Sequence, residues 1–105
     1  MSPITTHVLD TTSGRPAEGV GVAIEQQGDN GNWQVLGEGA TNEDGRIVDL
    51  LAHDSLTPGR FRMTFATGDY HARQGVAGFY TTVVIEFQIT AADQHYHVTL
   101  LLSTF

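Results

Sequence analysis

Short runs of apolar and β-branched residues alternate along the chain with turns that are marked by glycine. The turns place glycine beside Asp, Asn, Ser or Pro, which tolerate or pre-set turn dihedral angles, at residues 13–16, 28–31, 43–45, 57–59 and 67–69. The runs between them predict strands over residues 5–10, 19–26, 33–41, 61–66, 82–90 and 95–103. Short, regularly spaced strands separated by glycine turns are typical of a β-sandwich or barrel.

One segment departs from the strand pattern. Residues 69–74 predict a short helix, with Asp69 as its N-cap and Gly75 as its C-terminal stop. The chain shows no internal repeat and no linker, so we expect a single domain over residues 1–105.

Alternation within the first and last predicted strands indicates which side chains face the core. In the last strand we assign to the core the apolar set Tyr96, Val98, Leu100 and Leu102. The opposite face of that strand then carries His95, His97, Thr99 and Leu101. In the first strand Thr6 and Val8 would point inward, which leaves on the outward face Thr5, His7 and Leu9. Leucines beside histidines are unusual on the solvated surface of a monomer, so we expect these faces to meet another subunit.

The composition narrows the class of protein. The chain has 12 Asp and Glu against 5 Lys and Arg, and its net charge is −7. Nucleic acids and anionic membranes are bound through clustered basic residues, so neither is an expected partner. The absence of cysteine excludes disulfides, thiolate nucleophiles and Cys-ligated metal sites. No apolar run approaches the roughly 20 residues of a membrane span, and the N-terminus has no signal-peptide pattern, so we expect a cytoplasmic protein.

Two histidines and an arginine are the candidate catalytic residues. His97 and His7 lie on the predicted outward faces, and a histidine with its pKa near 6.5 can transfer protons at neutral pH. Arg46 follows a Glu-Asp-Gly turn, and its planar guanidinium can bind the oxygens of a small heterocycle and stabilise developing negative charge. Each of the three also has a purely structural interpretation, as a polar residue on an edge strand or at the rim of a turn.

Other motifs offer weaker chemistry. His95 precedes His97 by two residues, and with His7 the pair could give zinc three nitrogen ligands. No carboxylate has an evident ligand spacing, so we expect neither a metal nor another cofactor. Ser103 lacks the Gly-x-Ser-x-Gly context of a nucleophile elbow. The two remaining histidines are expected to be structural, His53 and His71.

Eight short motifs cover nearly the whole chain in a definite order. They read TTHVLD, GRPA, DGR, PGRF, TGDY, GFY, HYHV and LLLS, at residues 5–10, 14–17, 44–46, 58–61, 67–70, 78–80, 95–98 and 100–103. No one motif is specific, but the ordered set resembles the transthyretin-related 5-hydroxyisourate hydrolases. Two residues stand where that family often has proline, Thr99 and Thr104.

The resemblance implies an all-β fold, a transthyretin-like sandwich of two antiparallel sheets with one short helix. It also implies a homotetramer: two sandwiches join edge to edge, and two such dimers meet through the outward faces of their first and last strands. The tetramer would enclose a channel with a site at each end. The family normally has a Tyr-Arg-Gly-Ser ending that contributes to the site, and the resemblance leaves open both a chain that continues to this ending and a divergent member that lacks it.

The implied reaction is hydrolysis of 5-hydroxyisourate to 2-oxo-4-hydroxy-4-carboxy-5-ureidoimidazoline in urate catabolism, without a metal or cofactor. His7 and His97 would orient and deprotonate a water molecule and return a proton to the leaving nitrogen. Arg46 would orient the substrate and stabilise the oxyanion. The alternative is a non-catalytic transthyretin-like protein that binds a small ligand, and a third hypothesis, a structural sandwich module, leaves the histidines unexplained.

Overall fold

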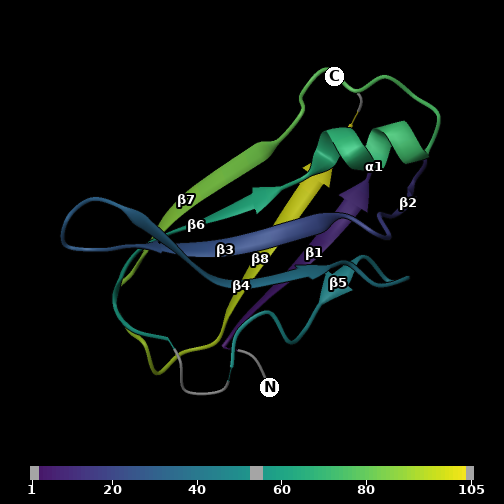
Figure 1. Cartoon of the computed structure of the whole chain (residues 1–105). Helices are drawn as coiled ribbons and strands as arrows, with labels where there is room; N and C mark the ends of the chain where they lie inside the picture. Colours follow the sequence, from purple (N-terminus) through teal and green to yellow (C-terminus); the bar gives the residue numbers. More distant parts are fainter. Residues whose placement is uncertain (1–2, 53–55, 104–105) are drawn as a thin grey trace.

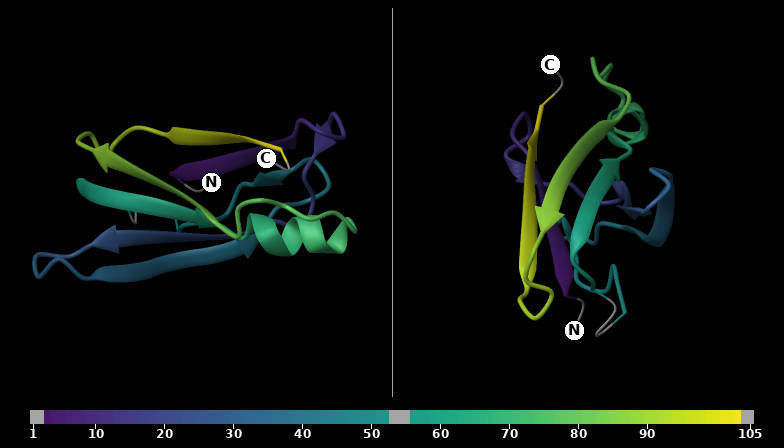
Figure 2. Two further views of the ribbon diagram at one scale, coloured as in Figure 1. Left: turned by 90° about the horizontal axis from the view of Figure 1, so that it is seen from above. Right: turned by 90° about the vertical axis from the view of Figure 1, so that its left-hand side faces the viewer.

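The computed structural model describes residues 3–52 and 56–103 and shows two β-sheets packed face to face, with a short helix at one end (Figure 1). Sheet A consists of β1 (Ile4–Asp10), β2 (Arg15–Pro16), β5 (Arg46–Ile47) and β8 (Tyr96–Leu102). Sheet B consists, in spatial order, of β4 (Trp33–Ala40), β3 (Gly21–Gln27), β6 (Gly59–Phe65) and β7 (Val83–Ile89). Seen from above, the sheets form two layers (Figure 2). The predicted two-sheet sandwich is confirmed.

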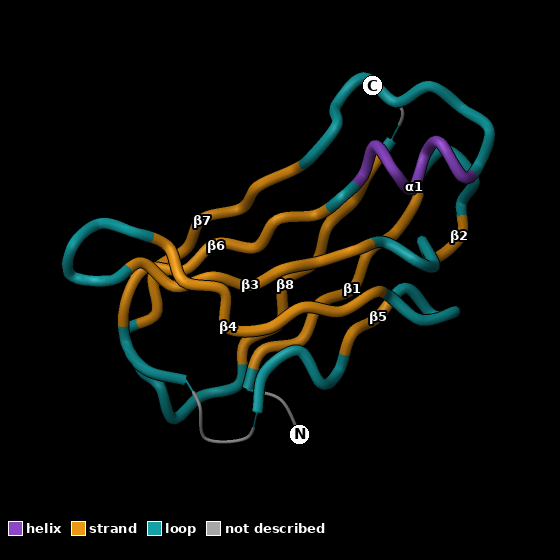
Figure 3. Tube along the Cα trace, viewed as in Figure 1, coloured by secondary structure: helices purple, strands orange, loops and turns teal. Residues whose placement is uncertain are grey.

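The six strands predicted from the sequence are all present, each ending within two residues of its predicted bounds (Figure 3). The strands β2 and β5 were not predicted, because two residues are too few to show an alternation. Pairing is antiparallel throughout sheet B and between β1 and its neighbours β2 and β5. The β1–β8 pair is parallel, so the expectation of wholly antiparallel sheets is wrong for this pair. The long connection between these strands through the rest of the sandwich allows it.

Side chains that alternate along the strands form the core between the sheets. In β6 every second residue is fully buried, Phe61, Met63 and Phe65 at 0% exposure. The Phe61 ring stacks on that of Phe87 in β7 with a centroid distance of 6.0 Å. Each such side chain, once fully buried, stabilises the fold by about 1.5–3 kcal/mol. The core is therefore set by the period-two pattern of the sequence.

The faces predicted for β1 and β8 are confirmed, with one difference. Val8 is buried at 0% exposure and Leu102 at 5%, whereas Leu101 on the opposite face is 62% exposed. His7 is half-buried and His97 is exposed, both on the outer face of sheet A. Thr5 shares this outer face but is only 7% exposed, because neighbouring side chains cover it.

Helix α1 (Thr67–Arg73) follows β6 and closes one end of the sandwich (Figure 1). Its N-cap is Ala66 without a side-chain cap, so the prediction of Asp69 as N-cap is wrong; Asp69 lies in the first turn. The helix begins earlier because Thr67 and Tyr70 both face the buried side. Gly75, with φ +74°, confirms the predicted stop. No helix of the described chain has the length and apolar character needed to cross a membrane.

The phenol of Tyr70 ties α1 to the end of β1. Its hydroxyl donates to Asp10 Oδ2 at 2.8 Å, with both residues buried. Burial raises the pKa of Asp10, but hydrogen bonds from Tyr70 and from the backbone of Ser13 and Thr12 outweigh it, and the pKa lies below its ordinary value. Burial and the bond to Asp10 raise the pKa of Tyr70 to about 12. This contact holds the helix end of the sandwich together and lies away from the histidine-bearing face.

Candidate active site

Three strands of sheet A bring the predicted catalytic residues together on its outer face. His7 in β1 lies directly opposite Arg46 in β5, and Thr5 in β1 lies directly opposite His97 in β8. Residues opposite each other in neighbouring strands project from the same face. The rings of His7 and His97 are 6.4 Å apart between centroids. The structure therefore gathers His7, Arg46 and His97 as one cluster, although they are far apart in the sequence.

A tight turn places Arg46 beside β1. The side-chain oxygen of Asn42 accepts hydrogen bonds from the backbone N–H of Asp44 and of Arg46, at 2.9 and 3.0 Å. Gly45 has φ +74°, and a Cβ there would lie 2.4 Å from the carbonyl oxygen of Val8. Only glycine allows this close approach, and the backbone N–H of Val8 donates to the Gly45 carbonyl at 2.7 Å. The turn thus fixes Arg46 at the edge of the histidine pair.

Thr5 contacts two histidines, His97 in β8 and His95, which directly precedes that strand. Thr5 Oγ1 is 2.7 Å from His97 Nδ1 and 3.1 Å from His95 Nε2. Alternation along the first strand placed Thr5 on this face, but its contact with the two histidines was not predicted from the sequence. The parallel register of β1 and β8 aligns Thr5 with His97. No local sequence pattern reveals this register, so the contact could not be predicted.

The surroundings of His97 favour its neutral form. Although His97 is exposed, partial desolvation of its ring lowers its pKa below the ordinary value, and the positive charges of Arg46, His7 and His95 lower the pKa further. A histidine of this kind is uncharged at neutral pH, so that one ring nitrogen keeps a lone pair and can accept a proton. The cluster therefore combines a proton acceptor with a guanidinium that can stabilise negative charge.

The geometry does not add a metal site to this cluster. Within the described ranges, no three His, Asp or Glu side chains are grouped so that they could hold an ion. His7, His95 and His97, the ligands considered from the sequence, are not brought into such a set. The absence of a metal requirement stays a prediction for experiment.

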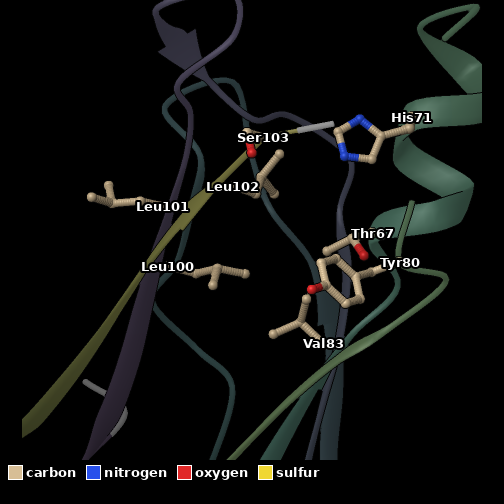
Figure 4. Close-up of a pocket in the computed structure, with 8 residues that line it drawn as sticks. All are labelled: Thr67, His71, Tyr80, Val83, Leu100, Leu101, Leu102 and Ser103. Carbon is tan, nitrogen blue, oxygen red and sulfur yellow. The ribbon is translucent and has the colours of Figure 1, made fainter. Parts of the chain in front are cut away.

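A cavity of about 210 Å³ lies elsewhere, between α1 and the ends of the sheets (Figure 4). Its walls are mainly apolar, with the lining residues Thr67, His71, Tyr80, Val83, Leu100, Leu101, Leu102 and Ser103. His71 is 3% exposed and packs closely against Gly78, where a Cβ would lie 2.5 Å from its ring. Ser103 belongs to this cavity and not to the histidine cluster. His53, expected from the sequence to be structural, lies outside the described residues.

Comparison with known proteins identifies the family. Residues 4–105 match the family described as HIUase/Transthyretin. The 5-hydroxyisourate hydrolase of Caulobacter vibrioides is 42% identical, with 100% of this chain and 93% of that protein covered. That of Mus musculus is 41% identical, with 97% and 87% covered. Among solved structures, sea bream transthyretin in complex with thyroxine has a TM-score of 0.94 at 30% identity, covering 99% of this chain and 89% of that chain. The chain belongs to the HIUase/transthyretin family.

Proposed function

We propose that this protein is a 5-hydroxyisourate hydrolase of urate degradation, which opens the ring of its substrate to give 2-oxo-4-hydroxy-4-carboxy-5-ureidoimidazoline. Relatives with this activity in their names are about 41% identical over nearly the full length. The observation that carries the proposal is the meeting of His7, Arg46 and His97 on the outer face of sheet A. Hydrolysis of a cyclic amide is accelerated by groups that transfer protons and by a group that stabilises the developing negative charge. The histidine pair can supply the first and the arginine the second.

In the proposed reaction His97 accepts a proton from water as the water oxygen attacks a ring carbonyl carbon. The Arg46 guanidinium stabilises the oxyanion, a contribution typically worth about 10²–10³-fold in rate. The carbon–nitrogen bond then breaks, and the histidine pair returns a proton to the leaving nitrogen. General acid–base catalysis of this kind contributes about 10²–10⁴-fold. Water is thereby added across one bond, and no oxidant or cofactor is consumed.

The proposal includes assembly into a homotetramer. The cluster lies on an open sheet face, beside Leu101, which is 62% exposed and lies directly opposite Leu9. A second subunit laid on this face would bury these leucines and turn the open face into a cleft. The strands β7 and β8 lie at the edges of the two sheets within the described chain, where edge-to-edge pairing with another copy would complete the dimer.

Sedimentation equilibrium tests the assembly. We expect a mass about four times the 11.4 kDa of the chain. A stable monomer would contradict both the interface and the cleft that it forms. The substitution Leu101→Glu places a charge on the proposed interface and is expected to dissociate the tetramer, while Val35→Glu, at an exposed position in β4 on the opposite edge of sheet B, leaves it intact.

A second candidate function is the binding of a small ligand without catalysis. The observation that favours it is the close structural match to sea bream transthyretin, whose structure is a complex with thyroxine. The higher identity to the hydrolases, about 41% against 30%, supports the enzyme. The two functions differ in one measurement, the rate at which the substrate disappears.

The decisive experiment generates 5-hydroxyisourate freshly by oxidation of urate and follows its decay by ultraviolet absorbance. We expect the purified protein to accelerate the decay in proportion to its concentration, after the spontaneous rate is subtracted. If the protein leaves the decay unchanged but binds an aromatic ligand at its subunit interface, the binding function replaces the hydrolase.

A further inference from the structure

One hydroxyl group bridges two histidine rings at the edge of the proposed site. Thr5 Oγ1 lies 2.7 Å from His97 Nδ1 and 3.1 Å from His95 Nε2, both within hydrogen-bond distance. The parallel register of β1 and β8 holds Thr5 directly opposite His97. Thr5 is 7% exposed, so water has little access to compete for its hydroxyl. The arrangement is thus a fixed feature of the sheet.

Only a few hydrogen-bonding patterns are possible among Thr5, His95 and His97, because each hydrogen bond needs one proton between its two heavy atoms. A threonine hydroxyl donates one proton and can accept others, and each ring nitrogen either carries a proton or accepts one. In one arrangement Thr5 donates to His95 Nε2 and accepts the Nδ1–H of His97. In the reverse arrangement Thr5 donates to His97 Nδ1 and accepts from His95. If both rings donated, the Thr5 proton would need a further acceptor, and none is found in the described part of the chain.

The two arrangements leave His97 with opposite chemistry. In the first, His97 Nε2 keeps its lone pair, and because His97 is exposed this nitrogen can take a proton from water. In the second, Nε2 carries the proton and His97 cannot act as a base. The first also survives catalysis without rearrangement, because His97 still donates from Nδ1 after Nε2 is protonated.

We propose that Thr5 is a positioning residue that holds His97 in the Nδ1–H form, by accepting that proton while donating its own to His95 Nε2. The catalytic consequence rests on the proposed hydrolase function, whereas the position of the proton on His97 does not. His95, which lies outside the cluster predicted from the sequence, thereby acts as the acceptor that orients the Thr5 hydroxyl. Neither residue touches the reacting atoms.

The charges around His97 agree with this assignment. The groups that act on it are Arg46 from β5, His7 from β1 and His95 before β8, all of which are positive when protonated. A neighbouring guanidinium favours a lone pair over an N–H dipole directed at it, because the lone pair is the negative end of the ring. The proposed arrangement needs a neutral His95, because its Nε2 accepts the Thr5 proton, so the charge argument rests on Arg46 and His7.

Nitrogen-15 NMR of the histidine rings, recorded on the ligand-free protein above pH 7, tests the proton position directly. We expect His97 to carry its proton on Nδ1 in the unaltered protein. Thr5→Val removes the hydroxyl and keeps the branched shape, and we expect it to shift His97 toward the Nε2–H form, while Thr5→Ser retains the original form. Thr99→Val, a matched change on the same face, should leave the signal unchanged.

A second variant keeps the test decisive if Thr5→Val fails to fold. His95 is exposed, so His95→Leu should leave the sheet intact while removing the acceptor of the Thr5 proton. The hydroxyl would then turn to His97 Nδ1 and move the His97 proton to Nε2. His95→Gln, whose carbonyl can still accept, should restore the Nδ1–H form. A His97 that carries its proton on Nε2 in the unaltered protein, or that does not respond to these variants, would overturn the proposal.

Kinetics separate this proposal from the function on which it rests. Thr5→Val should lower kcat at least about tenfold with little change in KM, as part of the roughly 10²–10⁴-fold that acid–base catalysis supplies, and Thr5→Ser should recover most of it. A protein that is inactive but shows the expected NMR pattern would refute the hydrolase and leave the proton assignment standing. An active protein whose Thr5→Val variant keeps full kcat would refute the positioning role.

Discussion

The outer faces of the two sheets carry their arginines in opposite ways. On sheet B, Arg62 donates through two nitrogens to the Glu25 carboxylate, at 2.9 and 3.1 Å, and its guanidinium lies 4.3 Å from the centre of the Trp33 ring. On sheet A, Arg46 lies opposite His7 and has no carboxylate partner among residues 3–52 and 56–103. The Arg62 guanidinium thus donates to a carboxylate of its own sheet, whereas the Arg46 guanidinium has no such partner among the described residues.

The different partners of the two arginines indicate different roles: Arg62 stabilises the fold, whereas Arg46 is available to bind a ligand. The pair on sheet B is neutral overall and bidentate, which orders two long side chains. On sheet A the charged groups that act on His97 are Arg46, His7 and His95, which are all positive when protonated. In a chain of net charge −7, a face with these residues is a local exception that suits an oxygen-rich substrate.

Replacing a histidine on sheet A is expected to have the largest effect. His97→Asn and His7→Asn should each lower kcat for 5-hydroxyisourate by about 10²-fold or more, because a group for proton transfer is lost. Asparagine keeps a polar side chain at an outer-face position, so the fold and the tetramer should persist. The measurement is the ultraviolet decay of fresh substrate with the spontaneous rate subtracted.

The matched control lies on the outer face of sheet B, where Thr64→Asn should leave the rate near that of the unaltered protein. His71 is unsuitable as a control, because it is buried at 3% exposure and its replacement would disturb the packing against Gly78. Equal losses of activity for Thr64→Asn and His97→Asn would mean that the histidine face is not the active site.

The two arginines should respond in opposite ways to the same substitution. Arg46→Lys should lower kcat/KM by about tenfold or more, since an ammonium cannot reproduce a planar two-pronged donor and one charge stabiliser is worth about 10²–10³-fold. Its thermal midpoint should stay unchanged. Arg62→Lys should lower the thermal midpoint and leave kcat/KM unchanged. An Arg62→Lys enzyme with impaired catalysis would show that the two faces are not functionally distinct.

The same comparison shows what the sequence could reveal. The six longer strands and the core faces of β1 and β8 followed from alternation, because a strand with one buried face has a period of two. The outward positions of His7 and His97 also followed from this pattern. It therefore placed on outer faces the two histidines to which the resemblance assigns catalysis. The strand β5, which carries Arg46, has two residues and no pattern of its own, so the chemistry of Arg46 could be predicted from its residue type but its place beside the histidines followed only from the resemblance.

Contacts between distant segments could not be predicted in this way. The hydroxyl of Thr5 contacts His95 and His97 because β1 and β8 pair in parallel in one register. The sequence of one strand does not reveal which strand it pairs with or in which register. The start of α1 was misplaced for a related reason: burial of Thr67 and Tyr70 outweighed the local capping preference of Asp69. Local patterns predicted elements and faces, and tertiary packing decided the rest.

The positive surroundings of sheet A predict a smaller effect, on pH dependence. Burial and then the neighbouring positive charges place the pKa of His97 below its ordinary value of 6.5, so the acid limb of kcat/KM should lie below pH 6.5. Replacing Arg46 by Gln removes a positive charge that disfavours protonated His97, and the limb should move toward higher pH. The variant Arg62→Gln should not move it. An acid limb above pH 6.5 in the unaltered enzyme would contradict the assignment of His97 as the base.

The smallest expected effect is that of a chelator, which should leave the rate unchanged. The nitrogens of His95 and His97 that face β1 are both hydrogen-bonded to the Thr5 hydroxyl, at 3.1 and 2.7 Å, so only the other nitrogen of each ring is available to a metal. The described part of sheet A offers no third ligand grouped with them. The measurement is hydrolysis after prolonged dialysis against a strong chelator, with Arg62→Lys treated in parallel to detect general damage to the fold. If activity disappears in the dialysed enzyme and returns with zinc, the histidines of sheet A are ligands, and the distinction between the two faces is one of metal binding and not of proton transfer.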